Sequence, residues 1–271
     1  MKQKKLLSTL FASALTLSML TSYGTMPVFA TDTETAETTE DAADTEAADS
    51  DTATDTDSQA ADSDASTDAD NETAAQQLLE DLTGSYQELW PVILDDKYEQ
   101  LWLDDCKELV GEDNAQAAYE KLASMVSGEI YGEEAVEAYA DGNGVYDCHF
   151  TEGVDTLEFD GSTSTIKGYD KDGEELFSHT YHYVGMEDLR GLYEYESDDA
   201  DSGEFTYFCI APDTNTTTYH IELRYGSDLE KLGQYDAGEY AYWLGSGIST
   251  EYDDEMVENC IELFCTENLS E

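Results

Sequence analysis

The chain has 271 residues and a formal net charge of −53, because 64 acidic residues face only 11 lysines and arginines. A surface this acidic is repelled by the phosphate backbone of DNA and RNA, which excludes nucleic acid as a partner and leaves cations as the favoured class. Residues 76–271, which follow two N-terminal segments of different character, are long enough for one ordinary domain with a complete core.

Residues 1–30 are typical of a cleavable signal peptide. Lysines stand near the start, an apolar run spans Leu6 to Leu20, and Ala30 precedes a sharply polar stretch. The apolar run is shorter than the roughly 20 residues that cross a bilayer, so we expect no transmembrane segment in the mature chain. A retained membrane anchor is the less favoured alternative. The predicted location is secreted or extracytoplasmic, either free or associated with the cell surface.

Residues 31–75 are predicted to form a disordered acidic linker. They consist almost entirely of Thr, Asp, Ala, Glu and Ser, without Lys, Arg, aromatic or branched apolar side chains. Nothing in such a segment offsets the entropy of ordering the backbone, and like charges extend it. A solvated spacer is the favoured interpretation, and a weak reservoir for divalent cations is the alternative.

Residues 76–271 are predicted to form one domain that begins with helices. Leucines and aromatic residues recur at steps of three and four from Leu78 to Leu109, with Pro91 as a break or kink. A second amphipathic segment runs from about Asn114 to Met125. A helix is also predicted near the C-terminus, over Asp253 to Phe264.

Short alternating stretches between these helical regions predict antiparallel strands. The predicted strands are 145–150, 156–159, 164–169, 176–184, 192–196, 205–210 and 217–225. The dipeptides Asp160-Gly161 and Asp172-Gly173 supply the positive φ that tight hairpins need. Asp170 to Gly173 also resembles the start of a calcium loop, but its flanking strands favour a hairpin turn. Closure into a barrel or a sandwich would remove unpaired strand edges.

The cysteines form an odd set in a chain expected to leave the reducing cytoplasm, so at least one thiol is free or pairs between molecules. They are Cys106, Cys148, Cys209, Cys260 and Cys265. None of the spacings is C-x-x-C, which argues against a zinc ribbon or a thioredoxin-type motif. Cys260 and Cys265 should point to different sides of one helix, so a bridge between them is not expected. Buried apolar packing is the favoured role.

Three stretches between Leu82 and Phe264 resemble, in order, the ZinT (YodA) family of lipocalin-like zinc-recruiting proteins. The first runs from Gly84 through Trp90 and Pro91 to Leu94, and the second runs from Leu189 to Glu194. The third comprises Asp199 to Phe205, Ile210-Ala211-Pro212, Tyr219-His220-Ile221 and Gly226 to Leu232. The third stretch is the most specific, because it joins a strand, a loop and a strand in the family's order.

The resemblance implies a mostly β fold, a lipocalin-like (calycin) antiparallel β-barrel with an N-terminal helical region and a C-terminal helix. It also implies zinc binding outside the cytoplasm by three histidines at one end of the barrel, and recruitment of zinc for an ABC-type importer. Two histidines two apart on one strand project from the same face, and a third comes from the neighbouring strand. An open fourth position would let the metal be passed on.

The sequence keeps only part of that histidine set. His220 matches the second histidine of the family's pair, but Thr218 replaces the first, and Phe208 or Cys209 stands in place of the third. We therefore predict a metal site formed by His220, Cys209 and Glu222. Glu222 shares the strand face of His220, and Cys209 would bind zinc as a thiolate if it faces the barrel interior. A hydrogen-bonded structural role is the alternative for His220, while His149, His179 and His182 are weaker candidate ligands.

Two functions follow from these predictions. The first is a secreted zinc-binding accessory protein with zinc as its bound ion and a zinc ABC transporter as a partner. The alternative is a metal-free, degenerate lipocalin-like surface protein whose tyrosine-rich strands bind a small ligand or a protein. An enzyme is not expected, because no nucleophile and base are assembled in the sequence.

Overall fold

The computed structural model describes residues 61–126, 128–142, 144–213 and 216–270. The predicted signal peptide and residues 31–60 of the predicted linker lie outside these described residues. Within them, no helix is both long and apolar enough to span a membrane.

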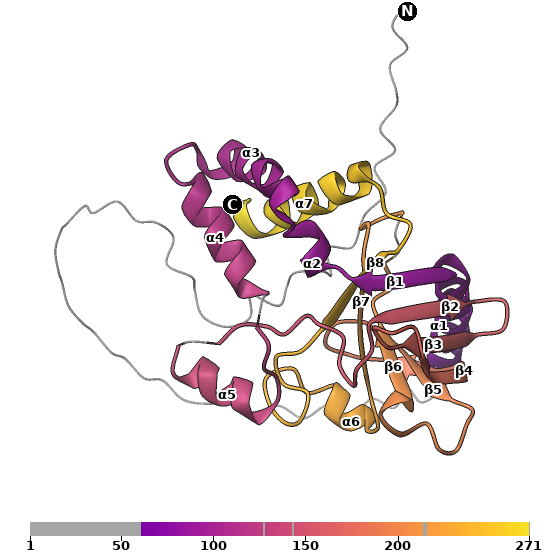
Figure 1. Cartoon of the computed structure of the whole chain (residues 1–271). Helices are drawn as coiled ribbons and strands as arrows, with labels where there is room; N and C mark the ends of the chain where they lie inside the picture. The colour runs from indigo at the N-terminus through magenta and orange to yellow at the C-terminus, as the bar shows by residue number, and fades with distance from the viewer. Residues whose placement is uncertain (1–60, 127, 143, 214–215, 271) are drawn as a thin grey trace, which may run out of the picture.

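The helices and strands alternate in blocks along the chain (Figure 1). The helices are α1 (Ala61–Asp81), α2 (Trp90–Ile93), α3 (Glu99–Val110), α4 (Ala115–Met125), α5 (Glu133–Ala140), α6 (Leu229–Leu232) and α7 (Asp254–Leu269), with short 3-10 turns η1 (Asp96–Tyr98) and η2 (Gly203–Phe205). The strands are β1 (Gly84–Glu88), β2 (Thr156–Asp160), β3 (Thr165–Tyr169), β4 (Glu175–Met186), β5 (Tyr193–Ser197), β6 (Tyr207–Ile210), β7 (Ile221–Gly226) and β8 (Gly245–Ser249).

The eight strands form one closed barrel in sequence order. Each strand pairs antiparallel with the next, and β1 pairs antiparallel with β8 to complete the ring. This up-and-down topology is that of the lipocalin-type barrels, and it leaves no unpaired strand edge. The predicted fold class, a barrel with flanking helices, is confirmed.

Aromatic side chains fill the barrel interior. Phe208 is fully buried and its ring lies 5.2 Å from that of Tyr181 and 5.1 Å from that of Tyr225. Other large buried rings of this cluster include Tyr86, Phe159, Phe177, Tyr195 and Trp243. Small barrels are commonly packed solid in this way, with inward residues alternating with outward ones along each strand. The tyrosine-rich strands that the sequence analysis considered for ligand binding therefore contribute at least Tyr181 and Tyr195 to the core.

Helix α1 packs against one end of the barrel. Ala75, Leu78 and Leu79 of this helix, and Leu82 just after its end, belong to the same buried cluster as the interior rings. The hydroxyl of Tyr195 donates a hydrogen bond to the carbonyl oxygen of Ala75, at 2.8 Å. The helix begins at Ala61, so it includes residues 61–75 of the segment predicted as linker. The physical reason is that a buried C-terminal half nucleates the helix, and acidic residues are favourable near its N-terminus.

The β2–β3 turn requires glycine for a reason that the sequence did not reveal. A Cβ on Gly161 would lie 2.4 Å from the Cα of Glu80 and 2.4 Å from the carbonyl oxygen of Leu79, so α1 can approach only a glycine. The positive φ of this turn falls instead on Ser164, at 51°. Thr83 Oγ1 accepts a hydrogen bond from the Gly161 amide and fixes the contact.

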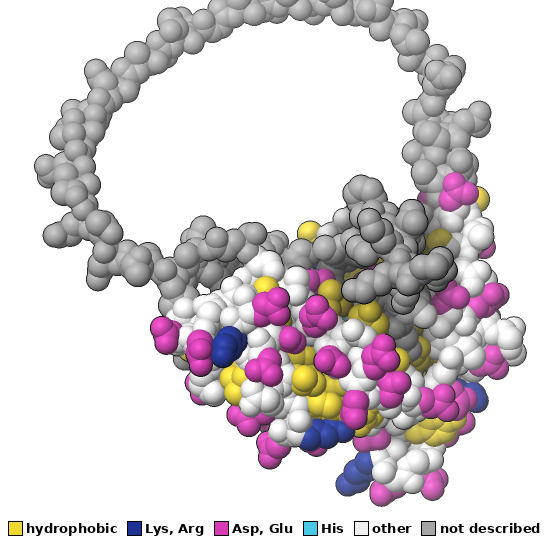
Figure 2. Space-filling view, turned by 90° about the horizontal axis from the view of Figure 1, so that it is seen from above, with side chains coloured by type: hydrophobic (Ala, Val, Ile, Leu, Met, Phe, Trp, Pro, Cys, Tyr) yellow, Lys and Arg dark blue, Asp and Glu magenta, His cyan; other side chains and the backbone are white. Residues whose placement is uncertain are grey.

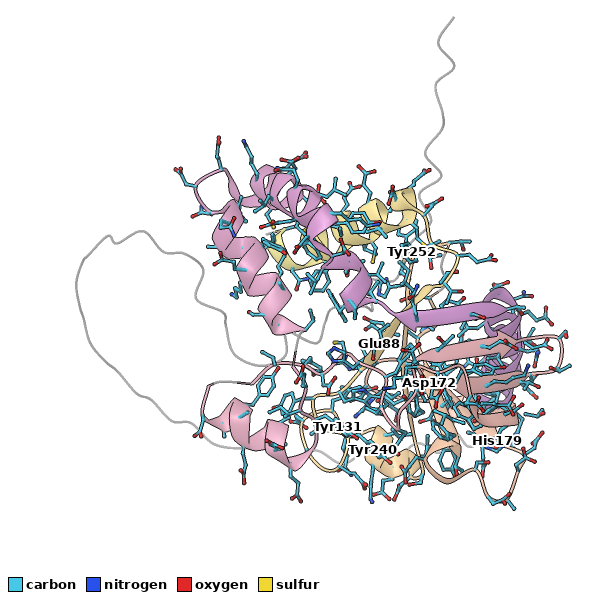
Figure 3. All side chains as sticks on the ribbon, viewed as in Figure 1. Glu88, Tyr131, Asp172, His179, Tyr240 and Tyr252 are labelled. Carbon is cyan, nitrogen blue, oxygen red and sulfur yellow. The ribbon has the colours of Figure 1, made fainter. Side chains whose placement is uncertain are left out.

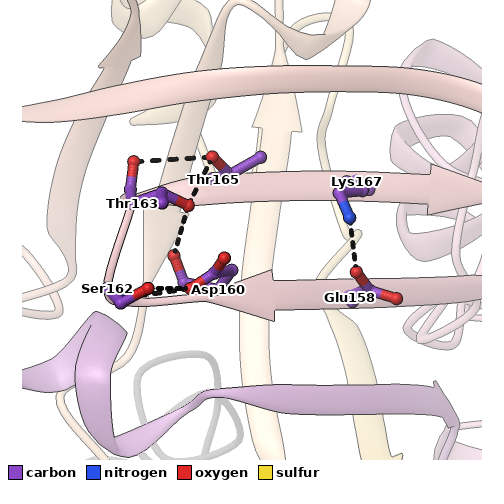
Figure 4. Close-up of polar contacts among 6 residues, drawn as sticks. All are labelled: Glu158, Asp160, Ser162, Thr163, Thr165 and Lys167. Carbon is purple, nitrogen blue, oxygen red and sulfur yellow. Dashed lines mark hydrogen bonds and ion pairs between the residues drawn. The ribbon is translucent and has the colours of Figure 1, made fainter.

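Local polar contacts stabilise the hairpins. In the β2–β3 hairpin, Lys167 donates to Glu158 at 2.6 Å and Asp160 Oδ1 accepts from the Ser162 hydroxyl at 2.6 Å (Figure 4). In the β3–β4 turn, Asp170 Oδ1 accepts from the backbone amide of Asp172. Gly173 closes that turn with φ 79°, so the predicted hairpin turn is confirmed there.

Helices α2, α3, α4 and α7 form a layer on one side of the barrel (Figure 1). Trp90 and Trp102 both pack against Phe264 of α7, with ring centroids 4.8 and 5.8 Å apart. Ile248, on the outer face of β8, is fully buried beneath this layer. The molecule therefore has two apolar clusters, one inside the barrel and one between its outer wall and the helices.

Three local predictions were wrong. β1 lies in a stretch that the sequence pattern predicts as helical, because Tyr86, Leu89 and Trp90 continue the spacing of the preceding helix. β8 was missed, because its sequence Gly-Ser-Gly-Ile-Ser has little β propensity. Residues 145–150 form no named strand and make only a bridge between Asp147 and Trp243.

Candidate metal-binding site

His220 is held at the start of β7 by an unusual backbone kink. Tyr219 has φ 67°, a left-handed conformation that is uncommon outside glycine. The kink brings the carbonyl oxygen of Thr218 to 2.7 Å from His220 Nδ1. If Nδ1 donates to this carbonyl, Nε2 is left free to accept a proton or bind an ion, as is usual for metal-binding histidines. Thr218 thus orients the His220 ring.

His220 and Glu222 lie outside the barrel wall. Ile221, Leu223 and Tyr225 belong to the interior cluster, so the alternate residue Glu222 faces outward. His220 shares this outward face, and both side chains lie under α2 and α7. We call this region, between β7 and α7, the seam.

Within the seam, His220 Nε2 lies 3.7 Å from Glu222 Oε1, and their side chains are only 10 and 11% exposed. This separation is longer than a hydrogen bond. Burial lowers the pKa of His220, but the opposing effects of Cys260 and Glu222 prevail and raise it well above 6.5. Without a metal, the ring is therefore expected to be protonated and paired with the carboxylate at neutral pH.

A cavity of about 20 Å³ lies beside this pair. It is lined by Leu89, Trp90, Ile93, His220, Glu222, Cys260, Leu263, Phe264 and Glu267. Its volume suits a single water molecule or one ion. Cys260 and Glu267 come from α7, and Cys260 Sγ lies 3.8 Å from His220 Nδ1. Sequence reasoning missed both as site residues, although the helical spacing of α7 already placed Cys260 on its apolar side.

Asp213 adds a further acidic group near the seam. Its Oδ2 atom is buried and has no hydrogen-bond partner among the described residues. Burial and the charge of Glu222 raise its pKa to about 6, while His220 opposes the shift. This residue, just after the Ile-Ala-Pro turn, was not among the sequence-predicted ligands.

Cys209 lies elsewhere on the outer wall. It pairs in register with Glu194 and Arg224, and segment 229–240 covers this part of the wall. Burial, followed by the charge of Glu194, raises the pKa of its thiol, so the thiolate that binds metals is disfavoured. The structure thus brings His220 and Glu222 together and places Cys209 beside Arg224.

The remaining histidines pair with aspartates. His179 Nδ1 lies 2.9 Å from Asp199, and His182 Nδ1 lies 2.8 Å from Asp198. His179 is on β4, far from α7 in the view of Figure 3. His149 Nδ1 lies 3.0 Å from Asp147, which raises the pKa of this histidine.

The donor chemistry of the seam suits zinc, since imidazole, carboxylate and thiol groups line one small cavity. These donor groups do not form a complete ligand set. Within the described ranges, no group of three or more His, Cys, Asp or Glu side chains is arranged to hold a metal ion. The seam therefore provides two close donors, with others nearby. The acidic surface seen in Figure 2, with few Lys or Arg side chains between the carboxylates, favours the approach of cations.

Comparison with known proteins finds similarity to solved structures only. No protein-family model matches the chain, and no curated protein is significantly similar to it. The Zn(II)-bound ZinT-like domain of Streptococcus pneumoniae AdcA is similar over 68% of this chain and 89% of that one, with 16% identity and a TM-score of 0.43. Zn(II)-bound AdcA from the same organism is similar over 71% of this chain and 35% of its own, with 16% identity and a TM-score of 0.40. The class that the topology defines is an eight-stranded antiparallel barrel with a helical layer.

Proposed function

We propose that this protein is an extracytoplasmic accessory protein that binds zinc through His220 and Glu222 and recruits it for an ABC-type importer. The observation that supports this most directly is the placement of His220 Nε2 3.7 Å from Glu222 Oε1, beside a cavity of about 20 Å³. The proposal includes no catalytic step.

The separation of the two donors is compatible with a shared ion. Zinc bonds to imidazole nitrogen and carboxylate oxygen are about 2.0 to 2.2 Å long, so both atoms could bind one ion without moving apart. The carbonyl of Thr218 supports the ring from the other side, as a hydrogen-bonded partner commonly does for a metal-binding histidine.

Further donors would come from rotation of nearby carboxylates. Glu267 lines the cavity, and Asp213 has a buried oxygen without a partner. A site with few permanent protein ligands keeps a position open, and this suits a protein that hands its ion on.

The test is zinc titration of the full chain by calorimetry in the presence of a competing chelator. We expect His220→Ala to weaken the tightest site by at least about tenfold, because it removes the nitrogen donor. His182→Ala is the matched control and should bind as the unmodified chain does. Both variants keep the acidic N-terminal segment, so their difference isolates the seam. Equal affinity in the two variants would refute the proposal.

Absence of any tight site in the unmodified chain would favour the alternative, a metal-free surface protein. The barrel interior is filled by aromatic rings, so a ligand or partner would bind outside it. Val184, Met186 and Leu189 are apolar and 39, 44 and 71% exposed, which offers such a partner an apolar contact near the end of β4.

A further inference from the structure

Two cysteines that are 159 residues apart in sequence meet in the helical layer. Cys106 of α3 and Cys265 of α7 are both fully buried, and their sulfur atoms are 3.9 Å apart. A disulfide bond is about 2.05 Å long. The two sulfurs are thus in contact as thiols, and a disulfide bond requires them to come closer by roughly 1.9 Å.

The other three sulfurs have different neighbours. Cys260 contacts His220, Cys148 lies near Trp90 and Ser246, and Cys209 lies beside Arg224. All five cysteines are buried and unbonded as thiols. The odd number that the sequence left unexplained therefore divides into one adjacent pair and three sulfurs in separate surroundings.

We propose that Cys106 and Cys265 form a disulfide bond when the chain folds under oxidising conditions, joining α3 to α7. The oxidant is a disulfide-bearing molecule such as oxidised glutathione. One cysteine thiolate attacks its disulfide and releases one glutathione thiolate. The second cysteine thiolate then attacks the mixed disulfide and releases the other. The two thiol protons end on the two reduced glutathione molecules, which carry the two electrons.

The contact makes the two thiols of the folded chain unequal. Hydrogen bonding from Cys265 lowers the pKa of Cys106, whereas the same contact raises the pKa of Cys265. A lower pKa increases the thiolate fraction, which is the attacking species. Because both side chains are fully buried, the bond is expected to form during folding and then to resist reductants that act only on the folded protein.

The bond would constrain more than the two helices. It closes a long loop that contains strands β2 to β8, and such a crosslink destabilises the unfolded chain by restricting it. Helix α7 also carries Cys260 and Glu267, which line the seam. The crosslink would therefore hold one wall of the cavity in place, yet its formation does not depend on zinc.

The test is to refold the reduced full chain in a glutathione redox buffer without metal. Alkylation under denaturing conditions should then count three free thiols rather than five, and peptide mapping should identify Cys106 linked to Cys265. The oxidised chain should melt roughly 5 to 10 °C above the reduced chain.

The double variant Cys106→Ala/Cys265→Ala should keep three free thiols and show no difference between oxidised and reduced melting. The matched variant Cys148→Ala/Cys209→Ala also removes two buried thiols, but it should retain the bridge. Five alkylated thiols in the unmodified chain after refolding, or a mapped bridge between any other pair, would overturn the proposal. Mapping of the unmodified chain decides the matter even if a variant fails to fold.

Discussion

The barrel interior and the seam between β7 and α7 are both buried, but they are built from different chemistry. The interior is occupied by aromatic rings that contact one another, edge-on for Tyr225 and Trp243 at 5.0 Å and tilted for Phe208 and Tyr225 at 5.1 Å. The seam contains an imidazole, carboxylates and a thiol around a small cavity. The barrel thus serves as a scaffold. The candidate metal-binding groups lie on its outer wall, where helix α7 covers them.

Removal of an interior ring should have the largest effect. Phe208→Ala deletes a fully buried ring that packs on Tyr181 and Tyr225, and should lower the free energy of unfolding by about 3 to 5 kcal/mol. Urea unfolding followed by circular dichroism measures this loss. Leu109→Ala, at a position that is 36% exposed, is the control and should change little. If the barrel interior and the seam act separately, the folded Phe208→Ala variant should bind zinc as tightly as the unmodified chain. A tenfold loss of zinc affinity would show that the two regions are coupled.

A change of pH should act on the seam with a smaller effect. The pKa of His220 is well above 6.5 in the folded chain, because Cys260 and Glu222 outweigh the effect of burial. Its stabilising contribution is therefore complete below about pH 6.5 and is lost as the pH rises through the folded pKa. The melting temperature of the metal-free chain, measured from pH 6.5 upward, should show this loss of stability.

The variant His220→Gln serves as the comparison for this pH series. It should remove the contribution of His220 to the pH dependence of stability. The contributions of other titrating groups, including Asp213, should remain. Zinc competes with the proton for Nε2, so zinc affinity of the unmodified chain should rise with pH over the same range. Parallel melting curves for the unmodified chain and the variant would contradict the assigned role of His220.

The smallest effect is expected from a like-charge cluster in the helical layer. Burial raises the pKa of Asp105 to about 6, and Glu262, Glu108, Glu258 and Asp104 add to the shift. Its charged form is thus disfavoured in the folded chain at neutral pH. Because the residue is only partly buried and solvent screens its charge, Asp105→Asn should stabilise the folded chain by only about 0.5 kcal/mol at pH 7. Thermal melting at pH 7 and pH 4 checks this, because the stabilisation by Asp105→Asn should vanish at pH 4. The control Asp104→Asn should stabilise the chain less at pH 7.

Much of the fold was predictable from local patterns, and the failures have identifiable causes. Alternating residues and Asp-Gly turns indicated β2 to β7. The closing strands β1 and β8 carry weak local signals, and β8 depends on tertiary packing. A Cβ on Gly247 would lie 2.9 Å from the ring of Phe150, so glycine is required there by close approach and not by a turn.

The candidate site was predictable only where its residues lie on one strand. His220 and Glu222 are two apart, so strand periodicity placed them on the same face, although it did not say which side of the wall they face. Cys260 lies 40 residues from His220 on a helix, and no local pattern links them. The separation of Cys209 from the pair follows from strand register, which a single sequence does not fix.

The closure of the barrel by the glycine-rich strand β8 has a consequence for biogenesis. A nascent or proteolysed chain that lacks residues 245–249 would present both β1 and β7 as open edges, since each pairs with β8. Exposed strand edges recruit other chains and promote aggregation. Quality control of this protein should thus act on the completion of one short, side-chain-poor segment.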